Sequence, residues 1–163
     1  MLAYRKSPVL TYFLGMAYSY QFSNNLLIPI AGLNWSPISR VNLVADLPFR
    51  GQVSWDLNSK IQTGFLYLNN RFTSYIPNIQ QYNYLWINER NLSWFTNLKM
   101  IRNWWLKFDL GYSISRELYA YDQLTRHSWQ IGSQLNGFNQ DPAYESSSKG
   151  LFLQCSIIYK MKK

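Results

Sequence analysis

The chain contains a single histidine, His127, which is followed directly by Ser128 in a long polar stretch. Histidine and serine are the general base and the nucleophile of many hydrolases, and a carboxylate must orient the histidine. All three groups have to be held in a fixed geometry, which two neighbouring residues of a polar loop do not provide. We therefore expect His127 and Ser128 to be solvated loop residues, and we predict no enzymatic activity.

Metal and cofactor motifs are missing from the sequence. A zinc site needs at least three protein ligands, whereas the chain has one histidine and one cysteine, Cys155. Because a lone cysteine forms no intramolecular disulfide, we expect Cys155 to act as a small hydrophobic residue within an apolar segment. The sequence also has no glycine-rich phosphate loop and no G-x-S-x-G elbow. We therefore predict neither a metal nor a cofactor.

Four charged residues fall on the polar faces of predicted strands. Lys107 and Asp109 are two residues apart, so they share one face of a strand. Asp46 and Lys99 occupy the corresponding face of two other segments. The interior of an eight-stranded barrel is just filled by side chains, and there these charges would pair as a polar plug. In a wider barrel the same four residues would line a pore.

The segments that contain these charges, and their neighbours, are predicted to be strands. Thr11 to Phe22 sets large apolar residues on one face and mostly small or polar residues on the other, with a period of two. Trp104 to Ser115 and Gly150 to Met161 repeat this pattern. Weaker strand signals occur at Leu27 to Trp35, Val41 to Leu47, Val53 to Leu57, Ile61 to Leu68 and Tyr84 to Met100. We therefore expect about eight strands and no helix.

The expected links differ in length between the two ends of these strands. Short turns at 36–40, 58–60 and 101–103 fall at one end, and long links at 69–83 and 118–149 fall at the other. Short turns opposite long loops are typical of bacterial outer-membrane barrels. Eight membrane strands of about 9–11 residues account for roughly half of the chain. The sequence therefore predicts one domain, residues 1–163, that forms an antiparallel up-and-down transmembrane β-barrel.

Composition excludes several other classes of protein. The 163 residues include 18% aromatic and only 15% charged side chains, which is unlike a disordered chain. No segment approaches the ~18 apolar residues of a membrane helix. A soluble lipocalin-like barrel that binds an apolar ligand is the remaining alternative, but its outer face would carry many Lys and Glu residues. The polar faces here consist mainly of small uncharged residues, which suit the interior of a membrane barrel better.

Aromatic residues gather at the ends of the predicted strands. Trp35, Trp55 and Trp104 stand beside tight turns, and Tyr20 and Phe22 finish the first strong strand at the opposite end. Indole and phenol rings prefer the headgroup zone of a bilayer, so these five residues predict two interfacial girdles.

The formal net charge is +8, and the basic residues gather near the tight turns and the termini. They are Arg5, Lys6, Arg40, Lys60, Lys99, Arg102, Lys160, Lys162 and Lys163. Such a rim would either meet anionic lipid headgroups or merely solubilise the turns. Nucleic-acid binding would require a basic patch interleaved with exposed aromatics, and we do not expect it.

The longest predicted loop, 118–149, mixes aromatic residues with small polar ones. Its aromatic residues include Tyr119, Tyr121, Trp129, Phe138 and Tyr144. Aromatic anchors of this kind suit recognition of a protein or a glycan at the cell surface. The alternative is an unstructured cap without a partner.

Three short runs carry a resemblance to a known family. The runs Asn34 to Pro37, Asp46 to Gly51 and Asn58 to Lys60 resemble those of uncharacterised Bacteroidetes-type outer-membrane β-barrel proteins. The resemblance implies the outer membrane of a Gram-negative cell and a barrel fold, but no reaction. The chain departs from the family in two ways: it does not begin with a leader peptide, and its last predicted strand does not end with an aromatic residue.

We therefore expect an integral protein of the cell outer membrane whose leader peptide is missing from this chain. Its barrel is either complete with about eight strands or the C-terminal part of a larger one. A structural or surface-interaction role is the first expectation, a porin-like channel for small solutes is the second, and the lipocalin-like barrel is the third.

Overall fold

The computed structural model describes residues 2–21, 24–75, 84–121, 129–131 and 142–159, and almost all of them lie in strands. The strands are β1 (Leu2–Ser7), β2 (Leu10–Gln21), β3 (Asn24–Ile38), β4 (Val41–Leu47), β5 (Arg50–Asp56), β6 (Ile61–Tyr75), β7 (Tyr84–Lys99), β8 (Trp104–Tyr121), β9 (Trp129–Ile131) and β10 (Tyr144–Tyr159). In the part of the chain that the structure describes, no helix is long and apolar enough to span a bilayer.

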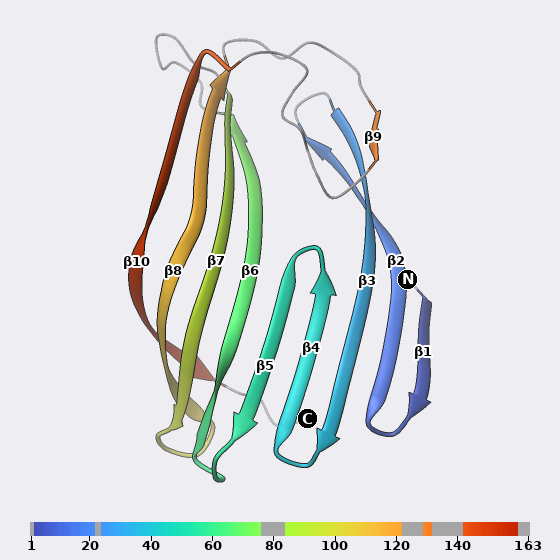
Figure 1. Cartoon of the computed structure of the whole chain (residues 1–163), viewed down its shortest axis with the longest axis vertical. Helices are drawn as coiled ribbons and strands as arrows, with labels where there is room; N and C mark the ends of the chain where they lie inside the picture. The colour runs from blue at the N-terminus through green and yellow to red at the C-terminus, as the bar shows by residue number, and fades with distance from the viewer. Residues whose placement is uncertain (1, 22–23, 76–83, 122–128, 132–141, 160–163) are drawn as a thin grey trace.

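Nine of the strands form one antiparallel meander in the order β1 to β8 and then β10, and β9 adds three residues parallel to β3. This confirms the predicted all-β, antiparallel up-and-down fold. The sheet is strongly curved (Figure 1). Within the described residues it does not close, because β1 pairs only with β2 and β10 pairs only with β8.

The meander has one strand more than the eight expected from the sequence. The additional strand is β1, whose residues Leu2, Ala3 and Tyr4 pair with Leu14, Phe13 and Tyr12 of β2. Its Arg5 and Lys6 conceal the apolar alternation, and charged residues are common on edge strands because they discourage pairing with other chains.

One end of the sheet, the lower end in Figure 1, has only tight turns, and the tight turn 48–49 between β4 and β5 lies at the other end. The turns at the lower end comprise residues 8–9, 39–40, 57–60 and 100–103. The third turn is closed by Asn58, whose Oδ1 accepts the backbone N–H of both Lys60 and Ile61 at 2.8 Å, as in an Asx turn. In the fourth turn Arg102 adopts a left-handed φ of 51°. The long links lie at the opposite end, which agrees with the sequence-based expectation.

A β-bulge interrupts β8 two-thirds of the way along the strand. Arg90 of β7 pairs with Ser115, whereas the next residue, Asn91, pairs with Ser113, so Ile114 has no partner of its own in β7. The pairing of β8 with β10 shifts at the same place. A bulge of this type changes which residues of a strand face which side. Beyond it, Arg116 faces the side that Ser113 faces before it.

The most buried large side chain, Phe95 of β7, is 2% exposed. It packs over Gly64 of β6, where a Cβ atom would lie only 2.9 Å from the Phe95 ring. Around it the buried side chains are mainly polar and include Ser54, Asn97 and Asp109. The centre of this sheet is therefore not the apolar core of an ordinary soluble domain.

Candidate functional site

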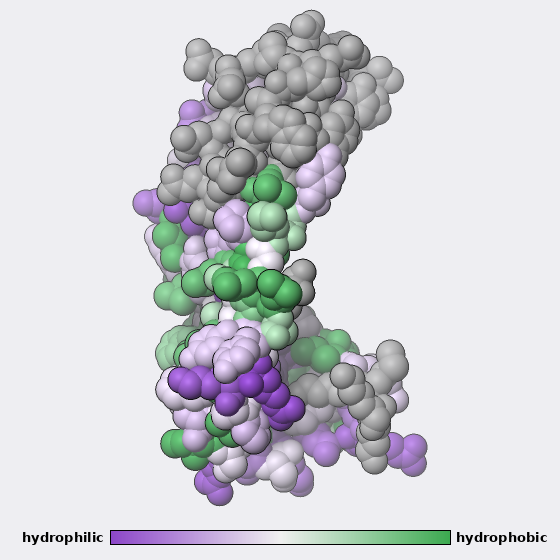
Figure 2. Space-filling model, turned by 90° about the vertical axis from the view of Figure 1, so that its right-hand side faces the viewer, coloured by the Kyte–Doolittle hydropathy of each residue, from purple (hydrophilic) through white to green (hydrophobic). Residues whose placement is uncertain are grey.

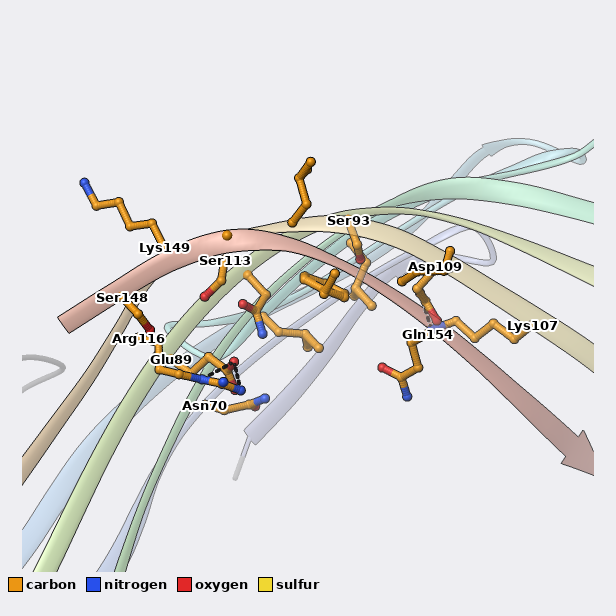
Figure 3. Close-up of a pocket in the computed structure, with 17 residues that line it drawn as sticks. Asn70, Glu89, Ser93, Lys107, Asp109, Ser113, Arg116, Ser148, Lys149 and Gln154 are labelled. Carbon is orange, nitrogen blue, oxygen red and sulfur yellow. Dashed lines mark hydrogen bonds and ion pairs between the residues drawn. The ribbon is translucent and has the colours of Figure 1, made fainter. Parts of the chain in front are cut away.

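The two faces of the curved sheet have opposite chemical character. We call the face that carries Asn70, Glu89, Arg116 and Gln154 the concave face, because these side chains lie beneath the arch of the sheet in Figure 3. The other face is the convex face. Successive residues of a strand point to opposite faces, so the strand register assigns every residue to one of them.

Large apolar side chains cover the convex face and are exposed. On β8, Trp104, Phe108, Leu110, Tyr112 and Ile114 are each between 40% and 52% exposed. On β10, Leu151, Leu153 and Ile157 are between 67% and 81% exposed. Figure 2, which faces the β1 side, shows an apolar band at mid-height with hydrophilic residues below it. We call this band the apolar belt.

The height of the apolar belt can be estimated from the number of β8 residues that it contains. Trp104 and Ile114 are ten residues apart, which is roughly 33 Å along a strand at about 3.3 Å per residue. With a strand tilt of about 40°, the vertical height is about 25 Å, the height of the apolar band on transmembrane barrels.

A chain of side-chain hydrogen bonds crosses the concave face near the tight-turn end. Gln62 Nε2 donates to Asp56 Oδ1 at 2.7 Å, and Asn97 Nδ2 donates to Gln62 Oε1 at 2.9 Å. The three residues come from β5, β6 and β7 and lie directly opposite one another in the register. Polar groups that are shielded from solvent need such partners, so these three residues form a connected polar layer on this part of the concave face.

The structure brings together two of the four charges predicted to face a barrel interior. Lys107 Nζ lies 2.7 Å from Asp109 Oδ1, and the Asp109 side chain is 5% exposed. Lys107 Nζ also lies 5.4 Å from the Phe95 ring centroid. Asp46 is on β4, opposite Arg50 of β5. Lys99 ends β7 opposite Trp105, next to a tight turn, and is exposed.

A second ion pair on the concave face was not predicted from the sequence. Arg116 Nη2 lies 2.8 Å from Glu89 Oε1. A strict alternation from Lys107 would have placed Arg116 on the convex face, and the bulge at Ile114 reverses this. The residues around Ile114 give no sequence signal for the bulge.

The two ion pairs stand at either end of a groove of about 600 Å³ on the concave face (Figure 3). Strands β6, β7, β8 and β10 line it. Between the pairs, Asn91 Oδ1 and Ser113 Oγ are buried and have no hydrogen-bond partner in the structure. Such atoms offer hydrogen bonds to water or to a polar solute.

A separate cluster occupies the convex face immediately beyond the apolar belt, on the side of the long links. Arg90 Nε donates to Ser115 Oγ at 2.8 Å, and Arg90 Nη2 lies 3.1 Å from Glu117 Oε1. Asn88 Nδ2 donates to Glu117 Oε2 at 2.9 Å, and Asn88 Oδ1 accepts from Arg71 Nε at 3.2 Å. We call these five residues the upper cluster.

The side chains of the predicted interfacial aromatics are exposed to different extents. Trp35 and Trp104 are 40% and 48% exposed, and Trp104 packs against Tyr159 with ring centroids 5.1 Å apart. Trp55 is half-buried and contacts Phe65 edge to face at 6.0 Å. Tyr20 belongs to β2 and pairs with Asn25, but its side chain and the whole of Phe22 lie outside the described residues.

The predicted loop 118–149 is partly wrong, because both of its ends belong to strands. β8 continues to Tyr121, which is 2% exposed, and Tyr119 stacks on Trp86 with ring centroids 5.0 Å apart. β10 begins at Tyr144, which is 49% exposed. Of the five aromatics proposed as surface contacts, only Tyr144 is therefore both described and exposed. Trp129 lies in β9, but its side chain is outside the described residues, as are Phe138, His127 and Ser128.

No protein-family model, curated protein or solved structure matches this chain. The resemblance to a family of outer-membrane barrels therefore stays a prediction.

Proposed function

We propose that this chain is an integral β-barrel protein of the bacterial outer membrane, with a structural or surface-interaction role and no catalytic chemistry. The observation that carries the proposal is the inverted distribution of its side chains. Large apolar residues cover the exposed convex face, whereas buried positions hold Ser54, Asn97 and the charged Asp109.

In water, this exposure of large apolar side chains would be unfavourable. Burying a single Leu or Phe side chain is worth ~1.5–3 kcal/mol, and the apolar belt leaves many such side chains exposed on several strands. Lipid removes this cost because its acyl chains contact the belt. A lipocalin-like barrel would place its apolar residues on the inner face, so the side-chain distribution argues against that alternative.

A porin-like channel for small polar solutes is the second candidate. Side chains just fill the interior of a barrel of eight strands. The meander already has nine strands and two unpaired edges, which favours a wider barrel. The groove of about 600 Å³ between its ion pairs supplies a polar surface for such solutes. Steps of conductance in a planar bilayer would support the channel, and a silent bilayer that contains inserted protein would support the structural role.

The membrane location can be tested with the sole cysteine, Cys155. It is exposed on the convex face of β10, between Leu153 and Ile157. A fluorophore on Cys155, in protein refolded with lipid vesicles, is expected to be quenched by lipids that carry bromine on their acyl chains.

The matched control moves the fluorophore one residue along β10. In a Cys155→Ser background, Ser156→Cys places the label on the concave face, opposite Lys107. This label should be quenched much less by the same lipids. Equal quenching at the two positions, or none at Cys155, would refute the membrane proposal.

A further inference from the structure

The apolar belt ends abruptly at the bulge of β8. Beyond Ile114, the convex face carries Ser115 and then Glu117, and the neighbouring strand β7 brings Arg90 to the level of Ser115. On the other side, Lys149 of β10 lies between Ser148 and Gly150, which pair with β8 across the same bulge. Figure 3 shows Lys149 on the opposite side of the sheet from the concave residues. Two cations therefore stand on the convex face at the edge of the belt.

Arg90 is held in place but stays accessible. Its Nε donates to Ser115 Oγ and its Nη2 pairs with Glu117, yet 42% of its side chain is exposed. Glu117 is fixed in turn by Asn88. An arginine that is oriented in this way loses little conformational freedom when it binds a further anion.

The charge balance at this level is positive. Arg71, Arg90 and Lys149 are the cations, and Glu117 is the carboxylate within the upper cluster. Glu145 lies one step farther from the belt, opposite Tyr119. Even when Glu145 is included, three positive charges face two negative ones.

We propose that Arg90 and Lys149 bind the phosphate group of a membrane lipid whose acyl chains lie over the apolar belt below them. This inference rests on the proposed membrane location. A guanidinium group donates paired hydrogen bonds to phosphate oxygens, and a lysine ammonium adds a point charge. The site lies where headgroups would begin, directly beyond Ile114, the last residue of the apolar belt on β8, so a lipid phosphate fits its position as well as its charge.

The test uses the full chain with a fluorophore on Cys155, which lies six residues below Lys149 on the same strand. The protein is refolded with phosphatidylcholine vesicles that contain either brominated phosphatidylcholine or brominated phosphatidic acid. Because the site holds the phosphate, phosphatidic acid should quench the fluorophore preferentially. Arg90→Gln should lower this preference about fivefold, the factor that corresponds to ~1 kcal/mol per cation at a charged lipid surface.

Two further variants make the outcome decisive. Arg116→Gln removes the same charge from an Arg–Glu pair at the same height, but on the concave face, and should leave the preference unchanged. Lys149→Gln alters an exposed side chain and should lower the preference even if Arg90→Gln disturbs folding.

Three results would overturn the proposal. They are an unaltered preference in both convex variants, an equal loss in Arg116→Gln, and no preference in the unaltered chain. If neither brominated lipid quenched the label, the membrane location itself would be refuted, and the lipid site with it.

Discussion

Placing arginine at Leu110 tests the depth of the apolar belt. Leu110 is 52% exposed on the convex face of β8, six residues from Trp104 and four from Ile114. Four residues at about 3.3 Å and a tilt of about 40° put it about 10 Å below the upper edge of the belt, close to the midplane.

The expected cost depends on that depth. Arginine at the midplane of a membrane barrel costs ~2–4 kcal/mol, whereas near the interface it costs ~0–1 kcal/mol. Leu110→Arg should therefore lower the free energy of unfolding by about 3 kcal/mol. The matched variant Ile114→Arg, at the edge of the belt, should lower it by less than about 1 kcal/mol.

The assay is urea unfolding of vesicle-inserted protein, followed by tryptophan fluorescence. With a urea dependence of ~2 kcal/mol per molar, Leu110→Arg should move the midpoint by about 1.5 M. A surface substitution in water changes stability by only about 0.5 kcal/mol in either direction. Similar small shifts for both variants would therefore refute the assignment of the convex face to lipid.

Two other predictions concern the concave face and the packing of the sheet. Lys107→Met should lower the free energy of unfolding by about 3 kcal/mol because it leaves the buried Asp109 carboxylate unpaired. Adding Asp109→Asn should recover part of this loss. A double variant that is no more stable than Lys107→Met would contradict the expectation. Gly64→Ala should cost about 1–3 kcal/mol, because the new Cβ would meet the Val53 carbonyl oxygen and the Phe95 ring. Gly51→Ala is its control, since the nearest side-chain atom would be 4.0 Å away, and equal losses in denaturant unfolding would disprove the packing argument.

The sequence predicts best the parts of the strands that lie within the apolar belt. From Trp104 to Tyr112 and from Leu151 to Tyr159, one face carries large apolar residues, and the other carries mainly small or polar ones, apart from Trp105, Phe152 and Ile158. This alternation is a local property of the chain, so it can be recognised without knowing which strands are neighbours. The alternation also places Lys107 and Asp109 on the same face, and the two side chains form an ion pair there.

Outside the belt the alternation disappears, and with it the sequence signal. β8 continues to Tyr121 and β10 begins at Tyr144, although neither extension alternates between apolar and polar residues. Backbone hydrogen bonds to the neighbouring strand are sufficient to extend a strand there, and they depend on pairing that the sequence does not reveal. For this reason the predicted loop 118–149 was too long.

The upper cluster and the concave pair of Arg116 with Glu89 were missed for a related reason. Both depend on the extra residue at Ile114, which decides the face on which Arg116 and Glu117 lie. Proline usually interrupts a strand, yet β3 passes through Pro29. Pro29 pairs with Met16 of β2 and lies beyond the last β4 pairing of β3, at Ala31, and proline is tolerated where a strand has a free side.

The odd number of strands in the meander has a consequence for how its edges can be satisfied. In an up-and-down sheet, successive strands run in opposite directions, so the first and the ninth run in the same direction. β1 and β10 therefore both run toward the tight turns, as their arrows in Figure 1 show. Direct contact between these two edges would create a parallel seam, and so would contact with a second copy inserted in the same orientation. A single strand that runs the opposite way would pair antiparallel with both edges at once and make the count even, as in bacterial outer-membrane barrels.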